Sequence, residues 1–396
     1  MRIALIADVF PPLRSSGAIQ LRDLSHELVH QGHQLTVMIP APDINQPWLL
    51  EKLGDVEVLR LKSPRTKDIS YARRTVGEFL MPFAMRRNLR KSPLANVRWD
   101  GVVWYAPTIF LGPIVDTIKK SSNCRSYLIV RDIFPEWAVD MGLLSRGLPY
   151  QFFKTIENYQ YSVADVIGVQ TPANLPYFSR LGLRPNQRVE VLQNWLAHAP
   201  VAGCSISVAS SALAGRTIFV YAGNMGVAQG MGILIDLAER LRSRKDIGFL
   251  FVGRGSSAKV LLDEARRRGL DNVAFYDEIE PEEISGLYSQ CHVGIVALDL
   301  RHKTHNIPGK LLTYLQAGLP VLASINPGND LVDLIKTDRV GQVCTNQSID
   351  ELVLLANQLV DDIKADLGIS ARCKELSTKL FSPETVAKQI TSALAR

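Results

Sequence analysis

Short apolar runs alternate with amphipathic segments along the whole chain. The candidate strands of the first half are mostly aliphatic runs of four to six residues, at 3–7, 35–39, 56–61, 101–105, 126–130, 166–170 and 189–192. Runs without polar alternation are typical of parallel strands that are buried on both faces. Helical periods lie between them, as at 19–31, where Gly32 provides a stop signal.

The alternation pauses once and then restarts. Residues 197–215 are small and aperiodic, and further strands are expected at 217–222, 247–252, 273–276, 292–298, 320–323 and 340–344. This pattern predicts an α/β protein with two doubly wound, Rossmann-like domains that face a hinged cleft. We place the first domain at 1–196, a linker at 197–215 and the second domain at 216–379. The last helix, at 380–396, is expected to return to the first domain.

Length and composition fit this organisation. A chain of 396 residues suits two domains, and 46% hydrophobic and 21% charged residues argue against general disorder. No apolar run approaches the ~18 residues of a membrane span, and Asp8 interrupts the N-terminal strand too early for a secretory signal. The five cysteines form no C-x-x-C pair, which favours reduced thiols. We therefore expect a cytoplasmic protein.

The net charge of +6 is concentrated in one segment. Residues 65–98 hold nine basic and two acidic residues, a net +7, around the apolar stretch 79–85. Basic residues beside an apolar stretch favour an anionic membrane surface, with about 1 kcal/mol per charge near the headgroups. We expect peripheral attachment to the inner face of the cytoplasmic membrane through 65–98. The alternative is a solvated helix whose apolar face packs on the core; nucleic acid is not expected, because no nucleic-acid motif accompanies the charge.

Two motifs have weaker support than their patterns suggest. His26-Glu27-Leu28-Val29-His30 matches the H-E-x-x-H zinc pattern, but its histidines lie off the apolar stripe and no third ligand is evident. We interpret them as surface residues and expect no metal. The turn at 253–258, Gly-Arg-Gly-Ser-Ser-Ala, resembles a dinucleotide-binding loop but does not follow the first strand of a domain. We interpret it as a tight turn whose backbone can approach a phosphate.

Two later loops indicate an anion site. Residues 221–230 form a glycine-rich loop between a buried strand and a predicted helix at 231–241, and helix N-termini attract phosphate. Residues 301–310 collect one arginine, two lysines and two histidines before another helix. This segment is a plausible diphosphate site. The alternatives are a structural glycine turn and a solvated basic loop.

Several segments together resemble family 4 glycosyltransferases. They are Phe10-Pro11-Pro12 with Gly17, residues 32–37, residues 221–224 and, most specifically, residues 306–321. With residues 130–137, the chain is most similar to bacterial WbuB-type N-acetyl-fucosamine transferases of surface polysaccharide assembly. The resemblance implies a GT-B fold and a retaining, metal-independent transferase without cofactor. It implies a UDP-sugar donor that binds without a metal ion, and a lipid-diphosphate-linked saccharide acceptor in O-antigen or capsule synthesis.

The resemblance and the positions after strands supply the candidate site residues. The catalytic candidates are Asp132, Arg131, Lys310 and His305. The donor-binding candidates are Gly223, Asn224, Gly226, Gln229, Gly253, Arg254, Glu278, Lys303, Asn306, Ile307, Pro308, Gly309 and Thr313. The acceptor-binding candidates are Ser16, Gly17, Glu136 and Trp137, and the hinge candidates are Asn194 and Trp195.

The chain departs from the family pattern at the diphosphate site. Asn224 and Gln229 stand where the family has Arg and Lys, and His305 and Thr313 stand where it has two glutamates eight positions apart. Arg254, Lys303 and Lys310 are then expected to neutralise the diphosphate. A GT-B nucleotide-sugar epimerase, a nicotinamide enzyme and an inactive nucleotide-binding partner stay open as alternatives.

Overall fold

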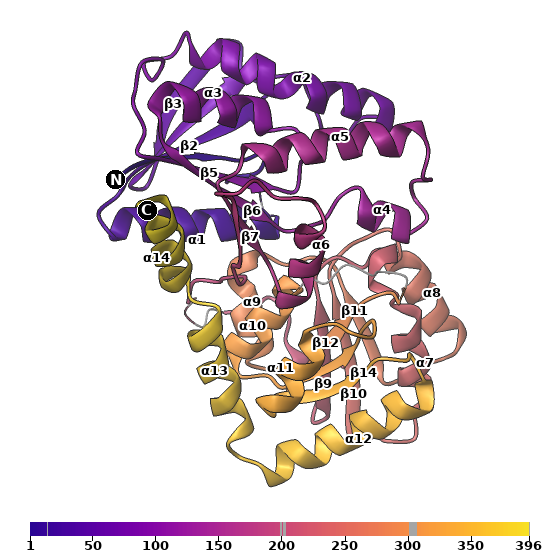
Figure 1. Cartoon of the computed structure of the whole chain (residues 1–396). Helices are drawn as coiled ribbons and strands as arrows, with labels where there is room; N and C mark the ends of the chain where they lie inside the picture. The colour runs from indigo at the N-terminus through magenta and orange to yellow at the C-terminus, as the bar shows by residue number, and fades with distance from the viewer. Residues whose placement is uncertain (14, 199, 201–202, 301–306, 396) are drawn as a thin grey trace. The chain divides into compact units, whose positions relative to one another are not determined.

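The computed structural model describes residues 1–13, 15–198, 200, 203–300 and 307–395, which form two compact units (Figure 1). Unit 1 comprises Met1–Trp195 and Pro383–Arg396, and unit 2 comprises Leu196–Ser382. The first domain was expected to end at residue 196, one residue later than unit 1 does. The segment 197–215, expected to be a linker, belongs to unit 2, because Ile206, Val208 and Leu213 enter its core.

Unit 1 is built on one sheet. Its strands are β1 (Arg2–Ile6), β2 (Gln34–Ala41), β3 (Trp48–Leu53), β4 (Val56–Lys62), β5 (Gly101–Ala106), β6 (Arg125–Val130), β7 (Val166–Val169) and β8 (Arg188–Val191). They lie in the order β3-β4-β2-β1-β5-β6-β7-β8, and all pairs are parallel except β3 with β4. The sequence pattern missed β3 because this edge strand is half-exposed and does not alternate.

Helices cover both faces of this sheet. They are α1 (Ser16–His30), α2 (Tyr71–Leu89), α3 (Gly112–Ser122), α4 (Glu136–Asp140), α5 (Leu148–Val163), α6 (Leu175–Ser179) and α14 (Pro383–Ala395). Alternate residues of β1 face opposite sides of the sheet and belong to two different hydrophobic cores. Leu5 packs in one core with α1 and α14, and Ile6 packs in the other with α2, α3 and α5. Helix α14 lies beside α1 (Figure 1), so the end of the chain completes unit 1. Within the described residues no helix is long and apolar enough to cross a membrane.

Unit 2 has a wholly parallel sheet. Its strands are β9 (Thr217–Ala222), β10 (Ile247–Val252), β11 (Val273–Tyr276), β12 (Val293–Ala297), β13 (Val321–Ser324) and β14 (Gly341–Cys344), in the order β11-β10-β9-β12-β13-β14. Its helices are α7 (Gly232–Arg240), α8 (Ala258–Arg267), α9 (Ile284–Tyr288), α10 (Gly309–Ala317), α11 (Leu331–Thr337), α12 (Ile349–Ala365) and α13 (Ile369–Leu380). Because the strands are parallel, the loops after them gather at one edge of the sheet, where such folds bind ligands.

Candidate functional site

The loops after β9 and β10 lie against each other in unit 2. The backbone N–H of Gly223 donates to the carbonyl of Val252 at 2.9 Å, and that of Met225 donates to the backbone carbonyl of Arg254 at 2.8 Å. Gly253 has φ +137°, and a Cβ atom on it would lie 2.2 Å from the carbonyl oxygen of Gly223. Only glycine permits this approach. The turn at 253–258 is therefore the structural partner of the glycine-rich loop.

Lys310 faces this loop from the second residue of α10. Its Nζ lies 4.5 Å from the ring centroid of Tyr221, and a Cβ on Gly223 would lie 3.4 Å from Nζ. No carboxylate pairs with Lys310 among the described residues, and burial lowers its pKa to about 8. A partly desolvated ammonium beside a loop of backbone N–H groups is complementary to phosphate.

Asn224 and Gln229 contact each other. The Gln229 side-chain oxygen accepts from the backbone N–H of Gly226 at 2.9 Å and from the Asn224 amide at 3.4 Å. These bonds close the short 3-10 helix Val227–Gln229. The two amides therefore shape the loop and bring no positive charge to it.

Arg254 and Glu278 form an ion pair at the same edge. Their side chains are joined at 2.8 Å and are 81% and 52% exposed. An exposed pair is worth little, typically below about 1 kcal/mol, so a ligand can compete for Arg254 at small cost.

The start of α10 supplies the remaining described donor candidates. Ile307 is buried, Pro308 is the N-cap residue and Gly309 begins the helix. The hydroxyl of Thr313 donates to the carbonyl of Lys310 at 2.9 Å, so its proton is used inside the helix. Lys303, His305 and Asn306 lie outside the described residues.

Arg131 is a buried cation at the end of β6 in unit 1. It is 8% exposed, and its guanidinium carbon lies 4.4 Å from the ring centroid of Trp195. Burial lowers the pKa of Arg131, although Tyr105 and Asp132 lie close enough to oppose the shift. None of its three side-chain nitrogens makes a hydrogen bond of ordinary geometry in the described chain. Such a group is costly unless a ligand completes it.

Four other polar residues lie near the same edge of the unit 1 sheet, each at the second position after the end of a strand. They are Asp8 after β1, Thr108 after β5, Thr171 after β7 and Gln193 after β8, and each has a buried side-chain oxygen with no hydrogen-bond partner among the residues described. Burial raises the pKa of Asp8 to about 6, partly against the charge of Lys67. This row was not predicted from the sequence, although the constant spacing after the predicted strands could have indicated it. It makes the carboxyl edge of the unit 1 sheet a candidate site for a polar ligand.

The hinge candidates are tied to α1. Gln20 donates to the side chain of Asn194 at 3.0 Å, and the indole N–H of Trp195 donates to the carbonyl of Gln20 at 2.6 Å. Both hinge candidates are buried, and Trp195 is the last residue of this part of unit 1. Ser16 and Gly17 begin α1; a Cβ on Gly17 would lie 3.1 Å from the Tyr105 hydroxyl.

The other acceptor candidates follow Asp132, which is exposed. Glu136 accepts hydrogen bonds from Tyr150 at 2.8 Å and Lys154 at 3.0 Å. Burial alone would raise the pKa of Glu136, but these two bonds hold it below its usual value. Glu136 therefore anchors α4 to α5. Trp137 contacts Phe134, with ring centroids 6.1 Å apart.

The H-E-x-x-H segment lies on α1. His26 and His30 are exposed, whereas Leu21, Leu24 and Leu28 are buried, as the helical period indicates. In the described part of the chain no group of three or more His, Cys, Asp or Glu side chains is placed to hold a metal ion.

Comparison with known proteins agrees with this architecture. Residues 216–362 match the family model described as glycosyl transferases group 1. A protein of Escherichia coli (strain K12), named as a colanic acid biosynthesis glycosyl transferase, WcaI, is 24% identical over 63% of this chain and 62% of its own length. WbjE of Pseudomonas aeruginosa, named as a glycosyltransferase, is 21% identical over 84% of this chain and 83% of its own. The chain thus spans less than two thirds of the WcaI protein.

A solved structure extends the comparison to the whole fold. Anabaena HepE in complex with UDP and glucose superposes with a TM-score of 0.69 at 15% identity, covering 99% of both chains. The expected GT-B fold, with two Rossmann-like α/β domains, is confirmed. The matches also support the expected enzyme class.

Proposed function

We propose that this chain is a glycosyltransferase that moves a sugar from a nucleoside-diphosphate sugar to a lipid-diphosphate-linked saccharide in surface polysaccharide assembly. The observation that carries the proposal is Lys310, an unpaired ammonium within the described residues, held against the glycine-rich loop of unit 2. The match of residues 216–362 to glycosyl transferases group 1 supports it. The names of WcaI and WbjE support the same assignment.

The donor diphosphate would bind between the glycine-rich loop and the start of α10. Cleavage of the sugar–phosphate bond leaves negative charge on the diphosphate. Lys310 and the backbone N–H groups of α10 would stabilise that charge, and fixed donors count most where charge develops. Arg254 would join them when its pair with Glu278 opens. No divalent cation is then needed.

UDP is the proposed nucleotide, and N-acetyl-L-fucosamine the proposed sugar. The UDP complex of the similarly folded Anabaena HepE supports the nucleotide. The resemblance to WbuB-type transferases supports both. Lys303, His305 and Asn306 stay candidates on the sequence alone.

The acceptor would bind at the carboxyl edge of the unit 1 sheet. Arg131 and Asp8 offer a buried cation and a buried carboxyl group there, and exposed Asp132 follows Arg131. We propose that the acceptor hydroxyl attacks from the face that the diphosphate leaves, with a phosphate oxygen taking its proton. This route retains the anomeric configuration and needs no side-chain nucleophile.

Residues 65–98 would hold the protein at an anionic membrane. Helix α2 exposes Phe79, Leu80 and Phe83 beside cationic residues. Exposed apolar side chains next to basic ones suit the interface of an anionic bilayer.

A panel of nucleotide sugars, incubated with a lipid-diphosphate-linked saccharide and followed by mass spectrometry, tests the proposal. We expect one donor to add one sugar to the acceptor. A sugar-nucleotide isomer formed without acceptor would instead identify an epimerase. Nucleotide binding without turnover of any donor would identify an inactive binding partner.

A further inference from the structure

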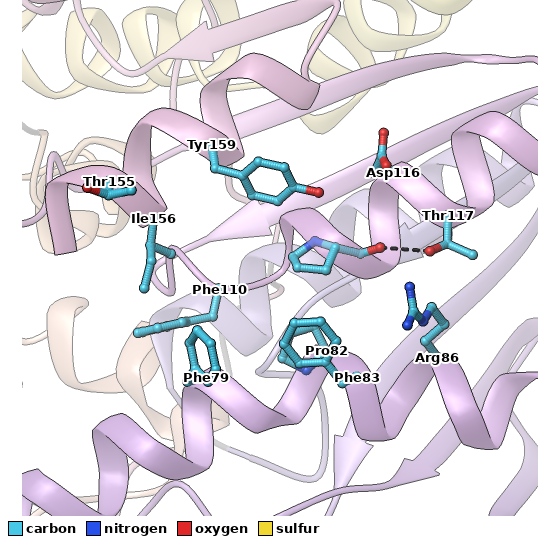
Figure 2. Close-up of a pocket in the computed structure, with 11 residues that line it drawn as sticks. Phe79, Pro82, Phe83, Arg86, Phe110, Asp116, Thr117, Thr155, Ile156 and Tyr159 are labelled. Atoms are coloured by element: carbon cyan, nitrogen blue, oxygen red, sulfur yellow. Dashed lines mark hydrogen bonds between the residues drawn. The ribbon is translucent and has the colours of Figure 1, made fainter. Parts of the chain in front are cut away.

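An open pocket of about 440 Å³ lies between α2, α3 and α5 in unit 1. Figure 2 shows Phe79 and Phe83 of α2 on one side and Ile156 and Tyr159 of α5 on the other. Its remaining walls include Phe110, two residues before α3, so most of the lining is aromatic or aliphatic. The volume is within the range of ~300–1,000 Å³ that is usual for small-molecule sites.

The walls of the pocket are exposed although they are apolar. Phe79, Phe83 and Tyr159 are 42%, 40% and 42% exposed. Helix α2 already buries a different face, through Met81 and Met85, in the core of unit 1. Packing of unit 1 therefore does not explain the second apolar face, and contiguous exposed apolar surface marks an interaction site.

One end of the pocket is cationic. Arg86 lines it, Arg87, Arg90 and Lys91 follow, and none of these four forms an ion pair with a described residue. Asp116, which also lines the pocket, is paired with Lys120 at 2.8 Å. An apolar cavity with a cationic end is complementary to a hydrocarbon chain that extends from an anionic membrane surface.

The positive charge of residues 65–98 argues against a second copy of this chain as the partner that covers the apolar face of α2. A symmetric contact through α2 would bring two segments of net charge +7 together. Like charges that face each other across an interface cost free energy.

A row of aromatic rings leads from the pocket to the end of β6. Ring centroids are 6.1 Å apart for Phe79 and Phe152, 5.3 Å for Phe152 and Phe153, 5.0 Å for Phe153 and Phe134, and 6.1 Å for Phe134 and Trp137. All five belong to unit 1. The row therefore links the pocket to α4, which begins with the acceptor candidates Glu136 and Trp137.

We propose that this pocket binds the hydrocarbon chain of the lipid-linked acceptor, which would enter from the membrane at the Arg86 end and follow the aromatic row to α4, where its diphosphate and saccharide reach the candidate acceptor residues. The identity of the lipid rests on the proposed function. The affinity of the pocket for an alkyl phosphate does not, so the two can be tested separately.

The variant Thr155→Trp distinguishes binding inside the pocket from nonspecific binding to an apolar surface. Thr155 lines the pocket from an exposed position on α5, so a tryptophan there obstructs the cavity while adding apolar surface. Asn158→Trp, also exposed on α5 but outside the lining, is the matched control. Equal melting temperatures of the two variants would show that both are folded.

The binding experiment uses the full chain and a farnesyl phosphate carrying a diazirine group. We expect light-induced labelling on α2 and α5, competed by farnesyl phosphate but not by inorganic phosphate. Thr155→Trp should reduce labelling at least about fivefold, and Asn158→Trp should leave it unchanged. Undiminished labelling of Thr155→Trp, or labelling spread over other surfaces, would overturn the proposal that the pocket binds the hydrocarbon chain.

A turnover experiment separates this inference from the proposed function. Thr155→Trp should raise KM for the lipid-linked acceptor about tenfold or more, while kcat/KM for the same saccharide on a short water-soluble aglycone stays within about twofold. Equal losses with both acceptors would contradict the pocket. If the protein uses no acceptor at all, the proposed function fails, and the labelling result alone decides whether the pocket binds an alkyl phosphate. A wild-type dimer that Thr155→Trp dissociates would assign the face to a second copy and overturn the proposal.

Discussion

Replacing Lys310 by methionine should remove most of the affinity of unit 2 for a nucleoside diphosphate. Methionine keeps an unbranched side chain beside Tyr221 but carries no charge. A hydrogen bond to a charged group contributes roughly 1.5–3 kcal/mol, so the Kd for UDP should rise about 10- to 100-fold at pH 7.

The pH dependence gives a sharper signature. The pKa of Lys310 is about 8 in the free protein because burial disfavours its charge, and a bound anion would raise it. Affinity should therefore be complete below pH 8 and decline as the pH rises through that value. At pH 9 only about one lysine in ten is protonated before binding, so the Kd should be about tenfold higher than at pH 7.

Calorimetry of UDP binding at pH 7 and 9 measures both effects. In buffers of different ionisation enthalpy, the wild type should take up about one proton per UDP at pH 9. Lys310→Met should show a Kd that changes only with the ligand's own titration, and Lys245→Met, at an exposed lysine of unit 2, should behave as wild type. A pH-independent difference between wild type and Lys310→Met, or a Kd for Lys310→Met within threefold of wild type at pH 7, would refute the reasoning.

Three further outcomes concern unit 1. Asp8→Asn should stabilise the protein at pH 8 by up to about 3 kcal/mol, because the pKa of Asp8 is about 6 in the folded state against an ordinary 3.8, so the ionised carboxylate is unfavourable there. The gain should vanish as the pH falls below 4, where Asp8 becomes protonated in both the folded and the unfolded state. Urea unfolding followed by tryptophan fluorescence measures it, since all five tryptophans lie in unit 1, and an equal gain at both pH values would be inconsistent with the pKa. Arg131→Met should cost little stability, because it removes a buried cation whose nitrogens make no hydrogen bond of ordinary geometry with the described residues. It should nevertheless reduce turnover by about 100-fold or more, and turnover within threefold of wild type would remove its proposed role. Four cations at the end of α2 and just after it form no ion pair with a described residue: Arg86, Arg87, Arg90 and Lys91. Changing all four to glutamine should lower binding to phosphatidylglycerol-containing vesicles at least about tenfold, and unchanged sedimentation would argue against docking there.

The fold was largely readable because buried parallel strands have a strong signal. Continuous apolar runs such as those of β1 and β12 need no knowledge of their neighbours. Edge strand β3 lacks such a run, because half of its environment is solvent. The segment 197–215 was assigned to a linker because its few apolar residues have no period, although they are buried by distant elements of unit 2.

The candidate site was readable only where local chemistry determines it. The glycine-rich loop and Lys310 follow from strand–loop–helix order, and the structure brings them together. The mutual contact of Asn224 and Gln229 and the anchoring of Glu136 depend on neighbours in space, so residue type alone does not reveal them. The lack of hydrogen-bond partners for Arg131 among the described residues likewise becomes evident only from the folded sheet edge.

The most direct test of the proposed function is product formation in the presence of a chelator. The full chain, a UDP-sugar panel, a lipid-diphosphate-linked saccharide and excess EDTA should yield UDP and an acceptor heavier by one sugar, with the anomeric configuration of the donor retained. Absence of product with every donor, inversion of the anomeric centre, or loss of activity in EDTA would contradict the account.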